Sequence, residues 1–473
     1  MKKRYAAAGL ALAAAGLMTA CGGGDDASPP PDTSARGTLL QVSLASHLER
    51  TEIDAAVAGS AGSLGAEPAT SPAAVTPGDL TAALAGAAVC AVDVRSVVYA
   101  TRDPLGQPAT ATAAVMVPSG KSALCSGARP VLLYAHGTTP LKSYDMADVW
   151  HTPESAAVMA FFAAHGYIVV APNYLGYGGS SLSWHPYLNA EAQAVDMIDG
   201  LRASLAHVKT LGGSLPSGQL FIAGYSQGGH VAMATHRAIE RDDAAEFTVT
   251  AAAPMSGPYN LVGFGDEVTE QNKPNIGGTL FMPLMLTSFQ KSYGGMYTTP
   301  ADAYRSPFDK TAEGLLPTDT PVATLVANDE LPQNDPTFSR LFGDGGLMTA
   351  DFQQNYAGSA FRQALQKNSL LGWTPKAPVA LCGGGDDPTV YFDNAIDMKQ
   401  DFASRGVVVP LWNMEDRSSL PAGASADAIY AAFQLAKYQE GTNAPLHYHG
   451  ELVPPACYAL VRGYFSQALG AAP

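Results

Sequence analysis

The segment LFIAGYSQGGH, residues 220–230, joins a short apolar run to a serine flanked by glycines. The apolar run predicts a buried strand, and residues 229–241 have the spacing of a helix. Ser226 would then lie in a sharp strand-to-helix turn, which is tolerated only where the residues two positions away lack side chains. Gly224 and Gly228 satisfy this condition. We therefore interpret Ser226 as a nucleophile, with the Gln227 amide facing a developing oxyanion; the alternative is a glycine-rich turn without chemistry.

The rest of the chain predicts an α/β fold, with a mostly parallel sheet that helices cover on both faces. Apolar runs typical of buried strands alternate with helical stretches. The expected strands are residues 96–100, 110–117, 131–135, 167–171, 220–223, 248–252, 379–382 and 407–411. The expected helices are residues 155–165, 190–211, 229–241, 391–404 and 426–439. Residues 259–372 interrupt this alternation with weak periodicity, so we interpret them as a cap, or lid, inserted into a core of residues 81–258 and 373–473.

A second oxyanion donor is expected where residues 131–135 run into His136-Gly137-Thr138-Thr139. A turn at Gly137 would let the next amide face the site, so Thr138 is the candidate. We expect His136 to be a structural histidine that fixes this loop.

A serine nucleophile needs a histidine as base and an acid that orients this histidine. In the expected fold both follow the serine in the chain, first the acid and then the histidine. After residues 379–382 comes a glycine-rich loop with two adjacent aspartates, Asp386 and Asp387. Near the end lie His447 and His449, before a helix expected from about 455 to 468. We favour His449 as the base because Gly450 and the distance to that helix suit a flexible loop. His447 remains the alternative, and a metal site with both histidines as ligands is a further one, although it would need a third ligand.

The first residues have the features of an export signal. A basic start precedes an apolar run and small residues, and the run is too short to span a membrane. The sequence around Cys21 resembles a bacterial lipobox, which implies a signal peptide at 1–20 and a lipidated Cys21; the alternative is simple secretion. Residues 21–80 are expected to hold a tether and an N-terminal helical segment, since 39–57 have helical spacing.

Four cysteines remain once Cys21 is set aside, and an even number in an exported chain favours two disulfides. From their positions we expect the pairs Cys90–Cys125 and Cys382–Cys457, although three connectivities are possible. The second pair would join the regions that carry the acid and the histidine.

Composition limits the possible partners. Of the 473 residues 47% are hydrophobic and 15% charged, so a large core is available and extended disorder is excluded. The net charge of −15 disfavours a nucleic-acid partner and anionic membrane faces. Any membrane contact is expected through the N-terminal lipid alone.

Several ordered blocks make the chain resemble α/β-hydrolases, and more narrowly the bacterial relatives of the secretory lipase family. The blocks are VLLYAHGTT (131–139), YIVVAPNYLGYGGSS (167–181), SWHPYLNAEAQAVDMIDGLR (183–202), LFIAGYSQGGHVAMATHRAIE (220–240) and CGGGDDPTVYFDNA (382–395). The spacing from Gly384 to Val390 resembles the acid loop of these enzymes and favours Asp387 over Asp386. The resemblance implies hydrolysis of small-molecule or lipid carboxylic esters through an acyl-enzyme, with no cofactor and no metal.

Other residues have both a functional and a structural interpretation. We expect His185 and Asp196 to pack the helix after the glycine loop. Four apolar cap residues either line an acyl pocket or belong to the core: Met282, Met285, Phe289 and Met296. The rival activity is that of a serine peptidase, for which Glu267 or Glu270 would hold a peptide amine. A non-catalytic surface lipoprotein is the rival from another class.

Overall fold

The computed structural model describes residues 35–59 and 77–470. The expected signal peptide, Cys21 and most of the tether lie outside the described residues. Within the described part, the helices include none with the length and hydrophobicity that crossing a bilayer requires.

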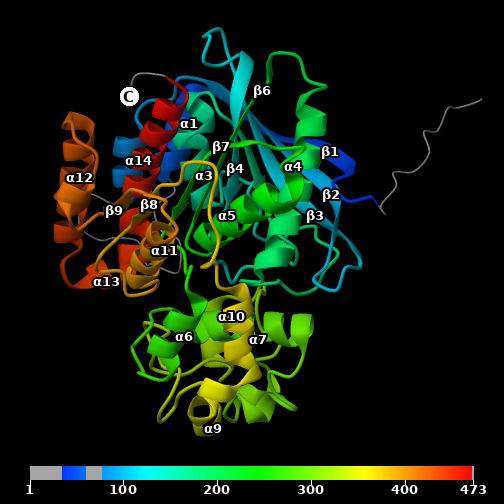
Figure 1. The fold of residues 1–473 in the computed structure, drawn as a ribbon, viewed down its shortest axis with the longest axis vertical. Helices are drawn as coiled ribbons and strands as arrows, with labels where there is room; N and C mark the ends of the chain where they lie inside the picture. Colours follow the sequence, from blue (N-terminus) through cyan, green and yellow to red (C-terminus); the bar gives the residue numbers. More distant parts are fainter. Residues whose placement is uncertain (1–34, 60–76, 471–473) are drawn as a thin grey trace, which may run out of the picture. The chain divides into compact units, whose positions relative to one another are not determined.

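The described strands form one nine-stranded sheet in the order β1-β2-β3-β5-β4-β6-β7-β8-β9 (Figure 1). They are β1 (Leu39–Leu48), β2 (Ala91–Arg102), β3 (Pro108–Ser119), β4 (Gly127–Ala135), β5 (Ile168–Pro172), β6 (Ser214–Tyr225), β7 (Val249–Met255), β8 (Leu381–Gly383) and β9 (Leu411–Asn413). The first three strands pair antiparallel, and β5, β4, β6, β7, β8 and β9 run parallel. The prediction of a mostly parallel sheet is therefore confirmed.

Helices pack on both faces of this sheet because its central strands are apolar on both sides. The helices are α1 (Arg50–Gly59), α2 (Pro77–Ala85), α3 (Pro153–Phe161), α4 (Ala190–Val208), α5 (Gln227–Ala238), α6 (Leu261–Thr269), α7 (Gly278–Tyr293), α8 (Val322–Ala327), α9 (Ala350–Gln354), α10 (Ala360–Asn368), α11 (Asp393–Ser404), α12 (Ala424–Glu440), α13 (Ala444–His447) and α14 (Val453–Ala468). Helices α1, α2, α3, α12 and α14 share one hydrophobic cluster, and α4, α5 and α11 share the other. Alternate residues of β4 join the two clusters in turn, as Leu132 and Leu133 do.

The expectation of a helix over 39–57 is wrong for its first half. Residues 39–48 form β1, which pairs antiparallel with β2 at the edge of the sheet, and a helix begins only at Arg50. The apolar residues of 39–48 fit both periods, and pairing with the open edge of β2 selects the strand.

Residues 259–372, which we call the cap, carry α6 to α10 and separate β7 from β8 in the chain (Figure 1). The cap has a third hydrophobic cluster of its own, which also contains Tyr187, Leu188 and Tyr391 from outside it. The cap therefore packs against the segments that follow β5 and β8.

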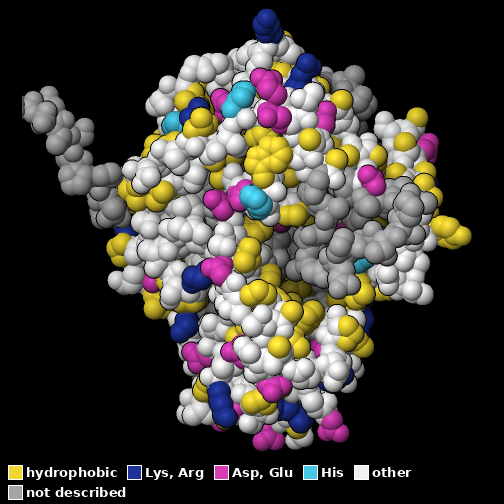
Figure 2. Space-filling view, turned by 180° about the vertical axis from the view of Figure 1, so that it is seen from behind, with side chains coloured by type: hydrophobic (Ala, Val, Ile, Leu, Met, Phe, Trp, Pro, Cys, Tyr) yellow, Lys and Arg dark blue, Asp and Glu magenta, His cyan; other side chains and the backbone are white. Residues whose placement is uncertain are grey.

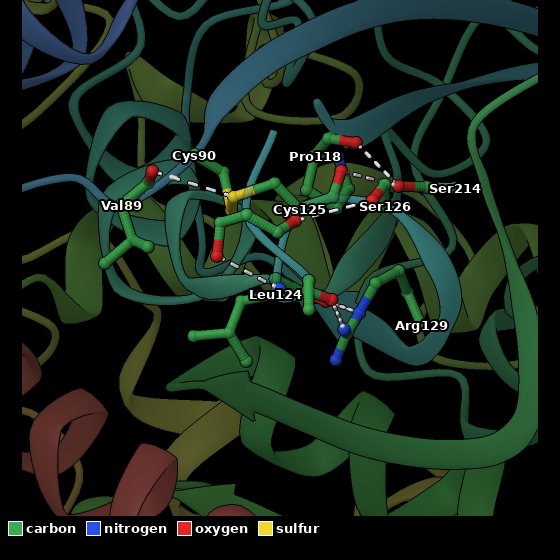
Figure 3. The surroundings of a disulfide bond; sticks show 11 residues. Val89, Cys90, Pro118, Leu124, Cys125, Ser126, Arg129 and Ser214 are labelled. Carbon is green, nitrogen blue, oxygen red and sulfur yellow. Dashed lines mark hydrogen bonds between the residues drawn. A yellow bond between two sulfur atoms is a disulfide. The ribbon is translucent and has the colours of Figure 1, made fainter. Parts of the chain in front are cut away.

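The structure contains both expected disulfides, Cys90–Cys125 and Cys382–Cys457. Hydrogen bonds connect the first disulfide to neighbouring strands. Ser214 Oγ of β6 donates to the carbonyls of Pro118 in β3 and of Cys125, at 2.7 and 3.1 Å (Figure 3). The second connects β8 to α14.

Candidate active site

Ser226 lies in the turn between β6 and α5, and its backbone is strained. Its φ is 59° and its ψ −122°, which a non-glycine residue adopts only where the surroundings enforce it. The close approach of neighbouring backbone explains the two glycines. A Cβ at Gly224 would lie 2.2 Å from the Gly228 carbonyl oxygen, and one at Gly228 would lie 1.9 Å from that of Ala135. No side chain fits at either position.

The structure brings Ser226, His449 and Asp387 into one hydrogen-bonded line. The Ser226 hydroxyl lies 2.7 Å from His449 Nε2, and His449 Nδ1 lies 2.6 Å from Asp387 Oδ2. The other oxygen, Asp387 Oδ1, accepts from the amides of Thr389 and Val390. These contacts leave Nε2 free to accept the serine proton while the carboxylate holds Nδ1–H.

The two alternative residues have other partners. Asp386 Oδ2 accepts from Lys437 Nζ at 2.7 Å, and His447 Nδ1 lies 2.7 Å from Glu440 Oε2. The two histidines thus face different groups, and among the described residues no three ligand-type side chains cluster as a metal site would need.

The expected flexible loop around His449 is wrong. The histidine lies in a π-helical turn, Tyr448–Leu452, between α13 and α14. The side chains of Tyr448 and Leu452 are buried and pack in the core, which explains the regular turn. The Tyr225 hydroxyl donates to the His449 carbonyl at 2.7 Å. His449 is therefore held by packing as well as by Asp387.

A second set of contacts joins the acid loop to this turn. Tyr448 Oη donates to Glu415 Oε1 at 2.5 Å, and Lys437 Nζ bridges Glu415 and Asp386. Together with Cys382–Cys457, these contacts fix Asp387 and His449 relative to each other.

The two expected oxyanion donors lie beside the serine. Gln227 is the first residue of α5, so its amide has no acceptor within the helix, and the helix dipole favours negative charge there. Thr138 follows β4, and both residues line the same cavity as Ser226. This arrangement can hold a negative oxygen next to Ser226.

Glu154 of α3 holds the loop that carries Thr138. Its carboxylate accepts from the Gly137 amide at 3.0 and 3.1 Å, from Tyr134 Oη at 2.7 Å and from Tyr144 Oη at 3.1 Å. Burial raises the pKa of this carboxyl, an effect that these hydrogen bonds oppose.

A cavity extends from Ser226 between the core and the cap. Its walls are mostly apolar: Tyr187, Leu188, Pro258, Leu261, Phe264, Val268, Phe281, Met282, Met285, Leu341, Phe361, Leu365 and Val390. Two of the four expected cap residues, Met282 and Met285, are among them, whereas Phe289 and Met296 are not. Figure 2 shows one face of the molecule, on which acidic and basic side chains are interspersed and hydrophobic side chains gather around a central hollow.

The residues expected to be structural are buried and hydrogen-bonded. Burial lowers the pKa of His136 to about 4 and that of His185 to about 3. Burial also raises the pKa of Asp196 to about 7, and this carboxylate accepts from Tyr99 Oη and the Leu175 amide. His185 differs from the other two, because its Nε2 contacts the side chain of Gln227.

Sequence reasoning missed Glu154 and Tyr187, although both contact the Thr138 loop. Tyr187 lies in a block that the sequence singled out for His185. Glu154 has no signal of its own, because its partners Tyr134, Gly137 and Tyr144 belong to β4 and to the loop after it, and spacing within α3 does not show these contacts.

Comparisons with known proteins bear on the family and the fold of the chain. The sequence model of the alpha/beta hydrolase family matches residues 131–432. Among proteins with curated descriptions, none matches the chain. A ligand-bound form of the rice cell wall degrading esterase LipA from Xanthomonas oryzae superposes with a TM-score of 0.70 at 29% identity, covering 90% of this chain and 98% of that one.

More distant structures share the fold. A putative hydrolase from Legionella pneumophila has a TM-score of 0.64 at 20% identity, covering 86% of this chain and 98% of that one. Candida antarctica lipase A has a TM-score of 0.52 at 12% identity, covering 80% and 76%. With a strained serine after β6, a mostly parallel sheet and a family match over more than half of its length, the chain belongs to the alpha/beta hydrolase family.

Proposed function

We propose that the chain is a carboxylic ester hydrolase with Ser226 as nucleophile, His449 as base and Asp387 as the acid that orients His449. The observation that carries the proposal is the line of contacts from Ser226 Oγ to His449 Nε2 and from His449 Nδ1 to Asp387, which opens onto an apolar cavity. The similarity to an esterase at 29% identity supports the same reaction class.

The reaction follows from this geometry in two steps. His449 Nε2 takes the hydroxyl proton as Ser226 Oγ bonds to the ester carbonyl carbon, and the Thr138 and Gln227 amides bind the oxygen that becomes negative. The carbon–alkoxy bond then breaks, and the alcohol leaves with the proton from His449. Water attacks the acyl-serine in the same way: His449 takes its proton, the carboxylic acid leaves, and the proton returns to Ser226 Oγ.

The cavity favours esters with an apolar acyl chain over peptides. Its lining includes Leu, Met, Phe and Val side chains of α6 and α7. The two glutamates considered for a peptide amine are absent from its lining among the described residues, and Glu267 is ion-paired with Lys273. We propose further that the cap acts as a lid over this cavity.

The proposal includes export and anchoring at the cell envelope through a lipid on Cys21, or secretion. The two disulfides support an oxidising compartment. Replacement of Cys21 by serine should release the protein from the membrane fraction, whereas an unchanged distribution would contradict the anchor.

Hydrolysis of p-nitrophenyl esters of increasing acyl length tests the activity. We expect Ser226→Ala and His449→Gln each to lower kcat by about 10³-fold or more while the protein still folds. His447→Gln, a matched histidine paired with Glu440, should keep wild-type turnover. Ester turnover in folded Ser226→Ala equal to wild type would refute the proposal, and turnover of peptides alone would favour the peptidase.

A further inference from the structure

The loop His136–Thr139, which carries the proposed oxyanion donor Thr138, has no regular secondary structure. Its position depends on side chains of residues 174–187, a segment that follows β5. Tyr174 Oη donates to the His136 carbonyl at 2.8 Å, and Tyr177 Oη donates to the Thr139 carbonyl at 2.8 Å. Both phenols are buried, so water does not compete for these bonds.

A third tyrosine of the same segment reaches Thr138 itself. The hydroxyls of Tyr187 and Thr138 share a hydrogen bond of 2.9 Å at the wall of the cavity. Tyr187 is only 5% exposed. This hydrogen bond holds the side chain of Thr138, the residue whose backbone amide is the proposed oxyanion donor.

The segment also holds the second donor residue. His185 Nδ1–H donates to the Leu175 carbonyl at 2.7 Å, which leaves Nε2 to accept from Gln227 Nε2 at 2.6 Å. Burial lowers the pKa of His185 to about 3, so the ring is neutral, as this pair of bonds requires.

The segment folds back on itself, which brings its two ends into contact. Gly176 has a φ of 94°, and a Cβ there would lie 2.4 Å from the Trp184 carbonyl oxygen. The Leu175 amide donates to buried Asp196 at 2.8 Å. The two ends of the segment are therefore fixed to each other and to α4.

We propose that residues 174–187, the tyrosine brace, are positioning residues that fix the Thr138 and Gln227 amides before substrate binds. This inference rests on the proposed esterase activity. Donors held in place need no reorganisation when the oxyanion forms, so the brace acts on the transition state more than on substrate binding.

Tyr187→Phe removes only one hydroxyl and tests the brace through kcat and KM. We expect kcat to fall about 10-fold with KM within about twofold, because positioning matters most in the transition state. Affinity for a trifluoromethyl ketone, which forms a tetrahedral oxyanion on the serine, should fall by the same factor. Tyr167→Phe, the same change at a buried tyrosine before β5 at the opposite end of the strands, should leave kcat and inhibitor affinity unchanged.

Thr138→Val removes the other end of the same hydrogen bond and keeps the backbone amide. We expect a similar loss, a double variant no worse than the stronger single variant, and greater activity in Thr138→Ser than in Thr138→Val. If Tyr187→Phe does not fold, Thr138→Val and Thr138→Ser carry the test. The brace is overturned if folded Tyr187→Phe and Thr138→Val both stay within twofold of wild type, or if their losses multiply. Turnover that survives in Ser226→Ala would instead overturn the proposed function.

Discussion

Removal of the Cys382–Cys457 disulfide by a double alanine substitution should impair both stability and catalysis. The bridge closes a loop with a sequence separation of 75 residues. By the loop-entropy relation, its loss costs about 4.5 kcal/mol of unfolding free energy at 25 °C. The first disulfide closes a separation of 35 residues, and the same relation gives about 3.8 kcal/mol.

The two disulfides contribute similar unfolding free energies, but only one of them lies close to the proposed catalytic residues. Cys382 lies in β8, which leads into the Asp387 loop, and Cys457 lies in α14, just after the turn that carries His449. Cys90 directly precedes β2, and Cys125 lies between β3 and β4. We therefore expect Cys382→Ala/Cys457→Ala to lower kcat about three- to tenfold through a looser Asp387–His449 contact. Cys90→Ala/Cys125→Ala should retain wild-type kcat.

Urea unfolding and p-nitrophenyl ester kinetics, both under conditions where the variants are folded, measure the two effects. Equal kcat in the two double variants would refute the idea that the second bridge positions the acid and the base. A loss of less than about 1 kcal/mol in either variant would refute the stability estimate.

The remaining predictions concern the oxyanion loop, a buried acid and the cavity. Glu154→Gln should lower kcat about 10-fold with little change in KM, because one amide oxygen cannot accept from Gly137, Tyr134 and Tyr144 together; an unchanged kcat would contradict this role. Burial raises the pKa of Asp196 to about 7, so between about pH 4 and 7 the folded protein binds a proton that the unfolded chain has lost, and folding stability should fall as the pH rises. The thermal unfolding of Asp196→Asn should lack this part of the pH dependence. Parallel pH profiles of the variant and the wild type would contradict this prediction. Met285→Trp should shift the optimum of ester hydrolysis to shorter acyl chains, because each methylene excluded from the cavity costs about 0.8 kcal/mol, roughly fourfold in kcat/KM. Met296 does not line the cavity, so Met296→Trp should leave the optimum unchanged. Identical chain-length profiles of the two variants would show that the acyl group binds elsewhere.

The turn around Ser226 could be predicted from sequence because local rules suffice there. An apolar strand, a helix and two glycines two residues from the serine leave few alternative structures, and the backbone contacts at Gly224 and Gly228 give the reason. The strand runs of the central sheet were predictable for the same reason, since residues buried on both faces give continuous apolar runs.

Contacts between distant segments could not be predicted in this way. Residues 39–48 become a strand only because β2 offers an open edge. Likewise Glu154 and Tyr187 belong to other segments and form hydrogen bonds with the Thr138 loop. The hydrophobic periodicity of a segment does not predict such contacts. The helices of the cap pack into a hydrophobic cluster of their own, and the weak periodicity of residues 259–372 does not show which of their side chains line the cavity.

Covalent labelling tests the central claim, that Ser226 is the nucleophile, most directly. A fluorophosphonate should add once to each active molecule, peptide mass spectrometry should find the adduct on Ser226, and ester turnover should fall in proportion to labelling. An adduct on another residue that accompanies the loss of turnover, or full turnover with Ser226 modified, would contradict the account.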